Sequence, residues 1–171
     1  MNSHSKYEML NLQYLQATSQ HLQLLVDSRV DFMREYLGKQ EKTIENKLRE
    51  ELKSFFEREI PALTYISCLA MNGEKLAGVG GMKIIQKPGS FRVPDGKCGY
   101  IMNMYTYPEY RRQGIGQTIL DKMIETGKAM GINFFELHAT KDGEPLYLKA
   151  NFQLHEEPTY RKFLSEMKTK T

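Results

Sequence analysis

Two N-terminal stretches of the chain place hydrophobic residues at three- and four-residue steps, which is the spacing of an amphipathic helix. The first stretch runs from Thr18 to Leu37. The second carries apolar residues at Ile44, Leu48, Leu52, Phe55, Phe56 and Ile60. Gly38 separates the two stretches, Thr43 is placed to cap the second, and Pro61 cannot continue it. The pattern predicts two successive helices.

The middle of the chain alternates between the pattern of strands and that of a helix. Apolar and β-branched runs predict strands over residues 63–71, 76–85, 100–106 and 132–140. Asn72-Gly73, a common hairpin turn, joins the first two of these strands. Helical spacing predicts a helix over residues 115–130, with Gly131 at its C-terminal cap. Residues 100–140 therefore form a predicted β-α-β unit, whose two strands are expected to be parallel.

The two ends of the chain complete the predicted order of elements. A strand is expected over residues 7–15, a short helix over 146–150, and a final pair of strands over 152–155 and 159–164. The resulting order, (β)ααββ-βαβ-αββ, predicts an α/β or α+β fold with a mixed central sheet and helices on both faces. Pairing of exposed edge strands at the C-terminus would give a homodimer.

Composition excludes several classes of function. The 171 residues suit one domain, residues 1–171. The net charge of +3, from 24 basic and 21 acidic residues, is too small to indicate nucleic-acid binding. Two cysteines cannot build a disulfide framework, and no cysteine or histidine spacing fits a metal site. Because no apolar run suits a membrane span or a signal peptide, we expect a cytoplasmic protein that contacts no membrane.

A glycine-rich turn between the predicted strand 100–106 and the predicted helix 115–130 points to anion binding. It reads Arg111-Arg112-Gln113-Gly114-Ile115-Gly116. Glycines let backbone N–H groups approach an anion, and the start of a helix aims free N–H groups and a positive dipole end at the same spot. The turn lacks the Gly-Lys-Ser/Thr of a P-loop, and Ile119 replaces the third glycine of a dinucleotide-binding turn. It is either a phosphate or diphosphate site or a surface turn with solvated arginines.

Residues 104–120, MYTYPEYRRQGIGQTIL, resemble the acetyl-CoA-binding motif of the GNAT superfamily of N-acetyltransferases. Arg111-x-x-Gly114-x-Gly116 is similar to the family's Arg/Gln-x-x-Gly-x-Gly/Ala, and residues 145–152, PLYLKANF, are similar to its Leu-Tyr-x-x-x-Gly-Phe. The resemblance covers an acetyl-CoA-binding core over residues 99–155. It implies a GNAT-like fold and transfer of the acetyl group of acetyl-CoA to a primary amine of a small molecule or peptide. The amine would attack directly in a ternary complex, without a metal.

The resemblance also implies which residues would hold acetyl-CoA and act in catalysis. The strand before the turn would pair with the pantetheine arm, and the amides of the turn would bind the diphosphate beside the charged Arg111. The implied cofactor-binding residues are Met104, Tyr105, Thr106, Arg111, Arg112, Gln113, Gly114, Ile115, Gly116 and Gln117. Tyr147 matches the position that often protonates the CoA sulfur. Its alternative role is to pack its ring on the core with the hydroxyl in water.

The general base is where the chain departs from the family. Several members place a glutamate on the strand before the turn, but residues 100–106 contain no carboxylate. Glu136 and His138, two apart on one face of the next strand, are the candidate bases, and a solvent-facing pair is the alternative. A water relay through Asn103 is a further route. If no base acts, the chain would be a CoA-binding sensor or interaction module.

The acceptor side is expected near the first two helices, by the same resemblance. Asp27, Asp31 and Glu35 recur every four residues on the first helix, either to attract a cationic amine or as its solvated face. Three aromatic residues, Phe32, Tyr36 and Tyr65, form either an acceptor wall or part of the core.

Overall fold

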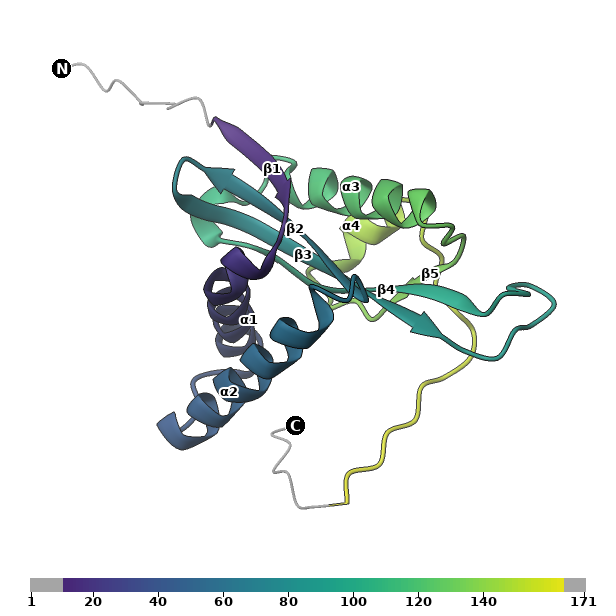
Figure 1. Ribbon diagram of the computed structural model, residues 1–171, viewed down its shortest axis with the longest axis horizontal. Coiled ribbons are helices and arrows are strands. Elements are labelled where there is room, and N and C mark those ends of the chain that lie inside the picture. The colour runs from purple at the N-terminus through teal and green to yellow at the C-terminus, as the bar shows by residue number, and fades with distance from the viewer. Residues whose placement is uncertain (1–10, 165–171) are drawn as a thin grey trace. The chain divides into compact units, whose positions relative to one another are not determined.

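The computed structural model describes residues 11–164, and the described residues fall into two compact units that divide between His138 and Ala139. The first unit contains a sheet and three helices, and the second contains one short helix (Figure 1). That residues 1–171 make a single domain stays a prediction.

The first unit is built on one five-stranded sheet. Its strands are β1 (Leu12–Gln16), β2 (Tyr65–Asn72), β3 (Lys75–Gln86), β4 (Lys97–Thr106) and β5 (Phe135–Leu137). They lie side by side in that order, antiparallel from β1 to β4 and parallel between β4 and β5. The hairpin prediction at Asn72-Gly73 is confirmed, with φ of 61° at Gly73. The predicted first strand is found at Leu12–Gln16, while its residues 7–10 lie outside the described residues.

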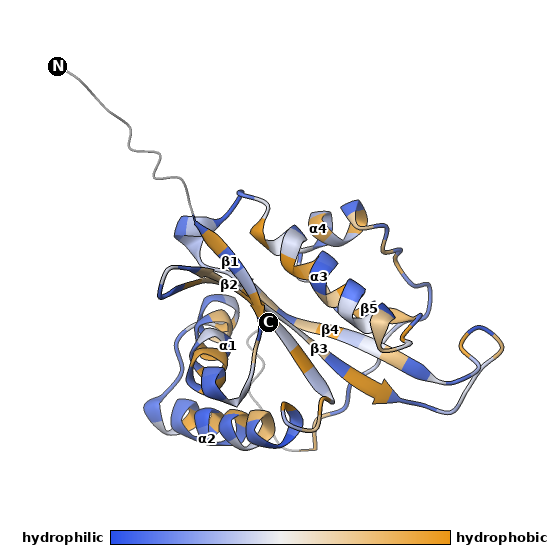
Figure 2. Ribbon diagram, turned by 45° about the horizontal axis from the view of Figure 1, so that its top comes forward, coloured by the Kyte–Doolittle hydropathy of each residue, from blue (hydrophilic) through white to orange (hydrophobic). Residues whose placement is uncertain are grey.

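Helices cover both faces of this sheet, as predicted. α1 (Leu22–Leu37) and α2 (Lys42–Glu59) lie on one face, and α3 (Ile115–Ala129) lies on the other (Figures 1 and 2). A short 3₁₀ turn, Ser19–His21, replaces the first predicted turn of α1. α2 begins one residue before the predicted cap Thr43, with Glu41 at its N-cap, and it ends two residues before Pro61.

Two packed layers hold the sheet between the helices. On the α1 and α2 face, the buried core includes Leu25, Val26, Phe56, Ile60, Tyr65, Leu69 and Val79. On the α3 face, the start of the helix lies against β3 at two glycines. A Cβ on Gly78 would lie 3.0 Å from Ile115, and one on Gly80 would lie 2.5 Å from Ile119. These glycines therefore set how closely α3 and the turn before it approach the sheet.

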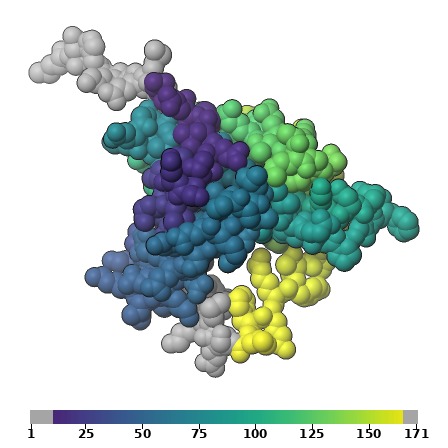
Figure 3. Space-filling model, in the orientation of Figure 1, coloured from purple at the N-terminus to yellow at the C-terminus, as the bar shows by residue number. Residues whose placement is uncertain are grey.

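The loop over residues 87–96 joins β3 to β4 and projects from the rest of the first unit (Figures 1 and 3). Both flanking strands are longer than the predicted strands 76–85 and 100–106, so the loop is shorter than the gap between those predictions. The side chain of Phe91 at its tip is fully exposed.

The second unit, described over residues 139–164, contains α4 (Glu144–Lys149). The helix ends in a left-handed residue, Asn151 at φ 64°, and the N–H of Phe152 donates to the carbonyl of Tyr147 at 2.9 Å. This is the hydrogen bond that closes a Schellman-type helix end. Asn151 thus adopts the conformation that the motif's usual glycine would adopt.

The predicted final strands, 152–155 and 159–164, are wrong: residues 152–164 form no strand in the described part of the chain. A strand needs a hydrogen-bonded neighbour. Here the N–H of Glu157 donates instead to His155 Nδ1 at 3.1 Å, and Pro158 has no N–H to offer. Leu154 is 88% exposed and Tyr160 is 89% exposed. The homodimer that was expected to form through these strands therefore loses its predicted basis. Within the described residues, no helix has the length and apolar character needed to cross a membrane.

Candidate functional site

The two parallel strands of the sheet separate after a short contact. β4 pairs with β5 only from Gly99–Phe135 to Ile101–Leu137, although β4 continues to Thr106. Beyond Ile101, the side of β4 that faces away from β3 has no strand partner among the described residues. This side includes the predicted positions Met104, Tyr105 and Thr106. An open strand edge offers backbone donors and acceptors that an extended ligand can pair with.

A bulge in β4 marks the point of separation. The register between β3 and β4 shifts between Val79 and Gly81, and Asn103 opposite them has φ of 56°. The bulge brings Met102 and Tyr105 both to the α1 and α2 side, although they are three residues apart. Asn103 Nδ2 donates to the buried Tyr65 hydroxyl at 2.8 Å, and Asn103 Oδ1 is buried without a partner in the described structure.

The turn before α3 exposes a row of backbone N–H groups. A 3₁₀ turn at Pro108–Tyr110 anchors it through the buried Tyr110. Arg112 and Gly114 then take left-handed conformations, with φ of 60° and 77°. Residues 112–117 donate no backbone hydrogen bond to any residue in the range 11–164, and the first bond into the helix is Thr118 to Gly114. No acidic residue lies in the first turn of α3, so the positive end of the helix is uncompensated.

The side chain of Arg111 supports this turn. Its Nε donates to the carbonyl of Thr106 at 2.9 Å, and its terminal nitrogen donates to both carboxylate oxygens of Glu35 at 2.7 Å. The guanidinium also lies over the ring of Tyr105, at 5.7 Å. Burial by itself would raise the pKa of Glu35, but hydrogen bonds from Arg111 and Tyr105 bring it below its usual value. Much of the charge of Arg111 is therefore already matched within the protein.

The other carboxylates of the acidic stripe on α1 are also matched by charges within the protein. Asp27 pairs with Arg49, and Asp31 pairs with Arg34 and accepts a hydrogen bond from the Tyr107 hydroxyl. Each carboxylate of the stripe thus has a cationic partner on α1, on α2 or in the turn. These pairs fix α1 to α2 and to the segment after β4. They leave little free negative charge for attracting an amine.

The two predicted bases have different partners. Glu136 Oε1 accepts from Lys87 Nζ at 2.8 Å, so its carboxylate is tied to the start of the loop over residues 87–96. His138 Nδ1 lies 2.6 Å from the Tyr100 hydroxyl. Tyr100 lies on β4 opposite Glu136, immediately before the strands separate. A histidine held by a tyrosine is equipped to accept a proton.

Tyr100 is a residue that the sequence analysis missed, because its partner comes from a strand 38 positions along the chain. The signal that could have revealed it is the parallel register of a β-α-β unit, which brings residues of its two strands together in pairs.

The aromatic residues of the predicted acceptor wall divide between two roles. Tyr65 is fully enclosed in the core, where burial raises the pKa of its phenol. Phe32 and Tyr36 stack at 6.0 Å between ring centres, and Phe32 lies 5.9 Å from Tyr105. The side chain of Tyr36 is 59% exposed. Phe32, Tyr36 and Tyr105 therefore form an aromatic surface beside β4, and only Tyr65 is core.

Tyr147 lies on α4 in the second unit. Its ring meets that of Phe152 edge to face, with 6.0 Å between ring centres. Burial raises the pKa of its phenol to about 12, so the hydroxyl carries its proton at neutral pH. A protonated phenol is the form that an acid catalyst requires.

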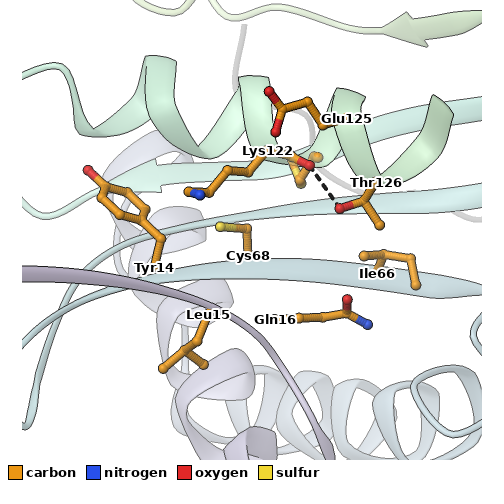
Figure 4. Close-up of a pocket in the computed structure, with 9 residues that line it drawn as sticks. Tyr14, Leu15, Gln16, Ile66, Cys68, Lys122, Glu125 and Thr126 are labelled. Atoms are coloured by element: carbon orange, nitrogen blue, oxygen red, sulfur yellow. Dashed lines mark hydrogen bonds between the residues drawn. The ribbon is translucent and has the colours of Figure 1, made fainter. Parts of the chain in front are cut away.

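A separate cavity of about 230 Å³ lies between β1, β2 and α3 (Figure 4). Lys122 reaches over the ring of Tyr14 there, and burial raises the pKa of Cys68 to about 11. None of the predicted site residues lines this cavity. Among the described residues there is no group of three His, Cys, Asp or Glu side chains that could hold a metal ion.

Comparisons with known proteins agree with this geometry. A family model described as "Acetyltransferase (GNAT) family" matches residues 28–152. No curated protein matches the chain. Among solved structures, a predicted acetyltransferase from Clostridium acetobutylicum, crystallised with acetyl-CoA, is 26% identical. That match has a TM-score of 0.81 and covers 88% of this chain and 96% of that one.

More distant structures share the fold alone. A GCN5-related N-acetyltransferase from Ralstonia eutropha is 23% identical, with a TM-score of 0.78 over 88% of this chain and 98% of that one. Glucosamine-6-phosphate N-acetyltransferase from Arabidopsis thaliana is 19% identical, with a TM-score of 0.63 over 90% of this chain and 99% of that one. The predicted mixed sheet with helices on both faces is confirmed by these matches.

Proposed function

The chain belongs to the GNAT family of acetyltransferases, and from this premise we propose that it transfers the acetyl group of acetyl-CoA to a primary amine of a small molecule or peptide. The observation that carries the proposal is a pair of backbone features near each other in the chain: the edge of β4 without a strand partner, and the N–H groups of residues 112–117, which donate no backbone hydrogen bond within the described residues. The first offers backbone hydrogen bonds to an extended chain and the second to an anion.

The residues present fit acetyl-CoA. An ideal Cβ on Gly114 would meet no heavy atom within 4 Å, so the turn is open where the amides point outward. Backbone N–H groups at a helix start are suited to a diphosphate. The edge of β4 at Met104 to Thr106, which has no strand partner, is suited to the amides of a pantetheine arm, with the Thr106 carbonyl already held by Arg111 Nε. When bound, acetyl-CoA supplies the acetyl group as a thioester.

Tyr100 and His138 are proposed to take the proton that the amine must lose. In the tautomer with the proton on Nε2, His138 accepts the Tyr100 O–H at Nδ1. The Tyr100 oxygen can then receive a proton from the amine while its own proton moves to His138. This pair would replace the strand glutamate that the chain lacks. Glu136 is the less suited base, since Lys87 already holds its carboxylate.

Tyr147 is proposed to protonate the departing thiolate, the role that the family resemblance assigns to it. Burial keeps its pKa near 12, so the phenol enters the reaction protonated. The proton it gives up is regained from water. The proton that the amine loses passes through Tyr100 to His138 and from there to solvent, so one proton leaves the amine for each proton that reaches the thiolate.

The proposal is tested by incubating the purified chain with acetyl-CoA and a panel of polyamines, aminoglycosides, amino acids and N-terminal peptides, and by following free thiol. We expect at least one amine to release thiol in proportion to acetylated product. His138→Gln and Tyr100→Phe should each lower kcat about 100-fold, as expected for the loss of general-base catalysis. His155→Gln, which changes an exposed histidine of the second unit, is the matched control.

Two results would overturn the proposal in different ways. Thermal stabilisation by acetyl-CoA without thiol release on any amine would indicate the alternative, a CoA-binding sensor or interaction module. Equal stabilisation by ATP would mean that the turn accepts another phosphate ligand.

A further inference from the structure

Arg29 on α1 has no counterion in the part of the chain that the structure describes. Among the described residues it makes no ion pair and no hydrogen bond, although its side chain is partly buried. Its guanidinium carbon lies 5.4 Å from the centre of the Phe32 ring. Other arginines of this region are matched, since Arg34, Arg49 and Arg111 each pair with a carboxylate. A partly buried charge that no protein group compensates is costly, and it can be compensated by a ligand.

Arg29 occupies an unusual place in its helix. It follows Leu25 by four residues and Val26 by three, so it lies on the apolar stripe that faces the sheet rather than on the solvated face. Burial lowers its pKa, and the nearby Tyr65 and Tyr100 phenols act in the opposite direction. Tyr100 lies on β4 at the level where β4 and β5 separate, and its phenol is close enough to act on the charge of Arg29.

Two further polar residues, Asn103 and Tyr100, lie on β4. Asn103, at the bulge of β4, donates through Nδ2 to Tyr65, while its buried Oδ1 has no partner in the described structure. The Tyr100 hydroxyl lies next to His138, the proposed proton acceptor. A ligand that carries an amine and an anion would find a proton acceptor and a cation on one face.

We propose that Arg29 binds a carboxylate of the amine acceptor, so that the acceptor is an amino acid or a similar carboxylated amine. This inference rests on the proposed acetyltransferase function. A single guanidinium matches the charge of one carboxylate and offers it two parallel hydrogen bonds. A phosphate, which carries more charge near neutral pH, would find a single unpaired arginine on this face among residues 11–164. The paired acidic stripe does not favour a polycation.

The test compares amines that differ only in their anionic group: serine, ethanolamine and phosphoethanolamine, and in parallel lysine and cadaverine. We expect kcat/KM to be at least about tenfold higher for the carboxylated member of each pair. Arg29→Gln should raise the KM for the carboxylated amine about 10- to 100-fold, as expected for lost charged hydrogen bonds, while the KM for acetyl-CoA stays within about twofold. Arg29→Lys should restore part of the affinity.

Direct binding supplies a readout that does not need turnover. Calorimetric titration of the preferred amino acid should detect binding to the wild type and to Arg34→Gln, a matched loss of a paired arginine from the same helix, but not to Arg29→Gln. Arg29→Gln should unfold at a temperature no lower than the wild type, because it removes an uncompensated charge. A stacking role on Phe32 alone predicts instead a lower unfolding temperature and equal loss for every amine.

The outcomes separate the two proposals. Thiol release with ethanolamine or cadaverine at the same kcat/KM as with serine or lysine would refute the carboxylate assignment and leave the acetyltransferase standing. Preference for phosphoethanolamine would show that the anion is a phosphate, which also overturns it. If none of the amines tested releases thiol, the proposed function itself fails.

Discussion

The turn at the start of α3 offers backbone groups to a ligand, whereas the face of β4 beneath α1 offers side chains. The turn presents main-chain N–H groups of residues 112–117, and the side chains there matter little to that display. The face of β4 presents side chains that come from α1, β4 and the end of β5, namely Arg29, Asn103, Tyr100 and His138. One region is contiguous in sequence, and the other is assembled from distant segments.

The difference predicts how each region responds to substitution. At the turn, what must be kept is the left-handed backbone at Arg112 and Gly114, so residues that adopt it are tolerated. On the face of β4, each side chain makes or offers a specific polar contact, so conservative changes should be harmful. The substitutions below test this difference and the catalytic assignment of Tyr147, in order of decreasing expected effect.

The largest effect is expected from Gly114→Val, because a β-branched residue at φ of 77° is strained and would pull the backbone out of shape. Losing two or more charge-assisted hydrogen bonds to the diphosphate should raise the KM for acetyl-CoA about 1,000-fold. Gly131→Val is a close control. Gly131 also has φ of 77° and nothing within 4 Å of its ideal Cβ, but it lies at the far end of α3.

Both glycine variants should lose similar stability, by about 1–2 kcal/mol in thermal or urea unfolding. Only Gly114→Val should lose acetyl-CoA binding. Similar coenzyme affinity in the two variants would argue against the turn as the diphosphate site.

A middle effect is expected from Tyr147→Phe, which keeps the ring against Phe152 and removes only the hydroxyl. We expect kcat to fall about 100-fold with little change in acetyl-CoA affinity, as for the loss of a general acid. Because burial raises the pKa of Tyr147 to about 12, the wild-type phenol stays protonated across the usual assay range. The kcat profile should therefore show no alkaline fall caused by this residue up to about pH 10. Unchanged turnover in Tyr147→Phe would remove its assignment as the acid.

The smallest effects are expected from the two arginines of the turn, compared with each other. Arg111→Ala loses the contacts to Thr106 and Glu35, and since that ion pair is exposed we expect only a five- to tenfold rise in the KM for acetyl-CoA. Arg112→Ala should change it by no more than about twofold, because only the backbone of Arg112 is needed. Steady-state kinetics at fixed amine would measure both, and the reverse order would mean that the Arg112 side chain contacts the coenzyme.

Much of the fold could be predicted from local sequence patterns. The helical spacing before Pro61, the Asn72-Gly73 hairpin and the Gly131 helix end are each set by neighbouring residues, and all three are confirmed. The prediction of the final strands was wrong because it, too, used only local pattern, and a strand also needs a partner from elsewhere in the chain. Alternation over residues 152–164 indicates that a strand is acceptable locally, but a strand forms only where another edge can pair with it.

The candidate site could be predicted only in part from the sequence. The turn was visible because its glycines and its helix follow one another along the chain. Tyr100 and Arg29 were not singled out, although Arg29 interrupts an apolar stripe and could have been questioned on that ground. The acidic stripe of α1 was seen, but its pairing with Arg34, Arg49 and Arg111 was not.

By itself, the sequence determined the order of the elements from β1 to α4 and the backbone turn before α3, because helix periodicity, hairpin turns and glycine positions act over a few residues. Only the tertiary structure decided which charges neutralise one another, where β4 separates from β5, and which cation on α1 has no partner among residues 11–164. Such pairings depend on side chains brought together from distant positions, and short-range patterns carry no information about them.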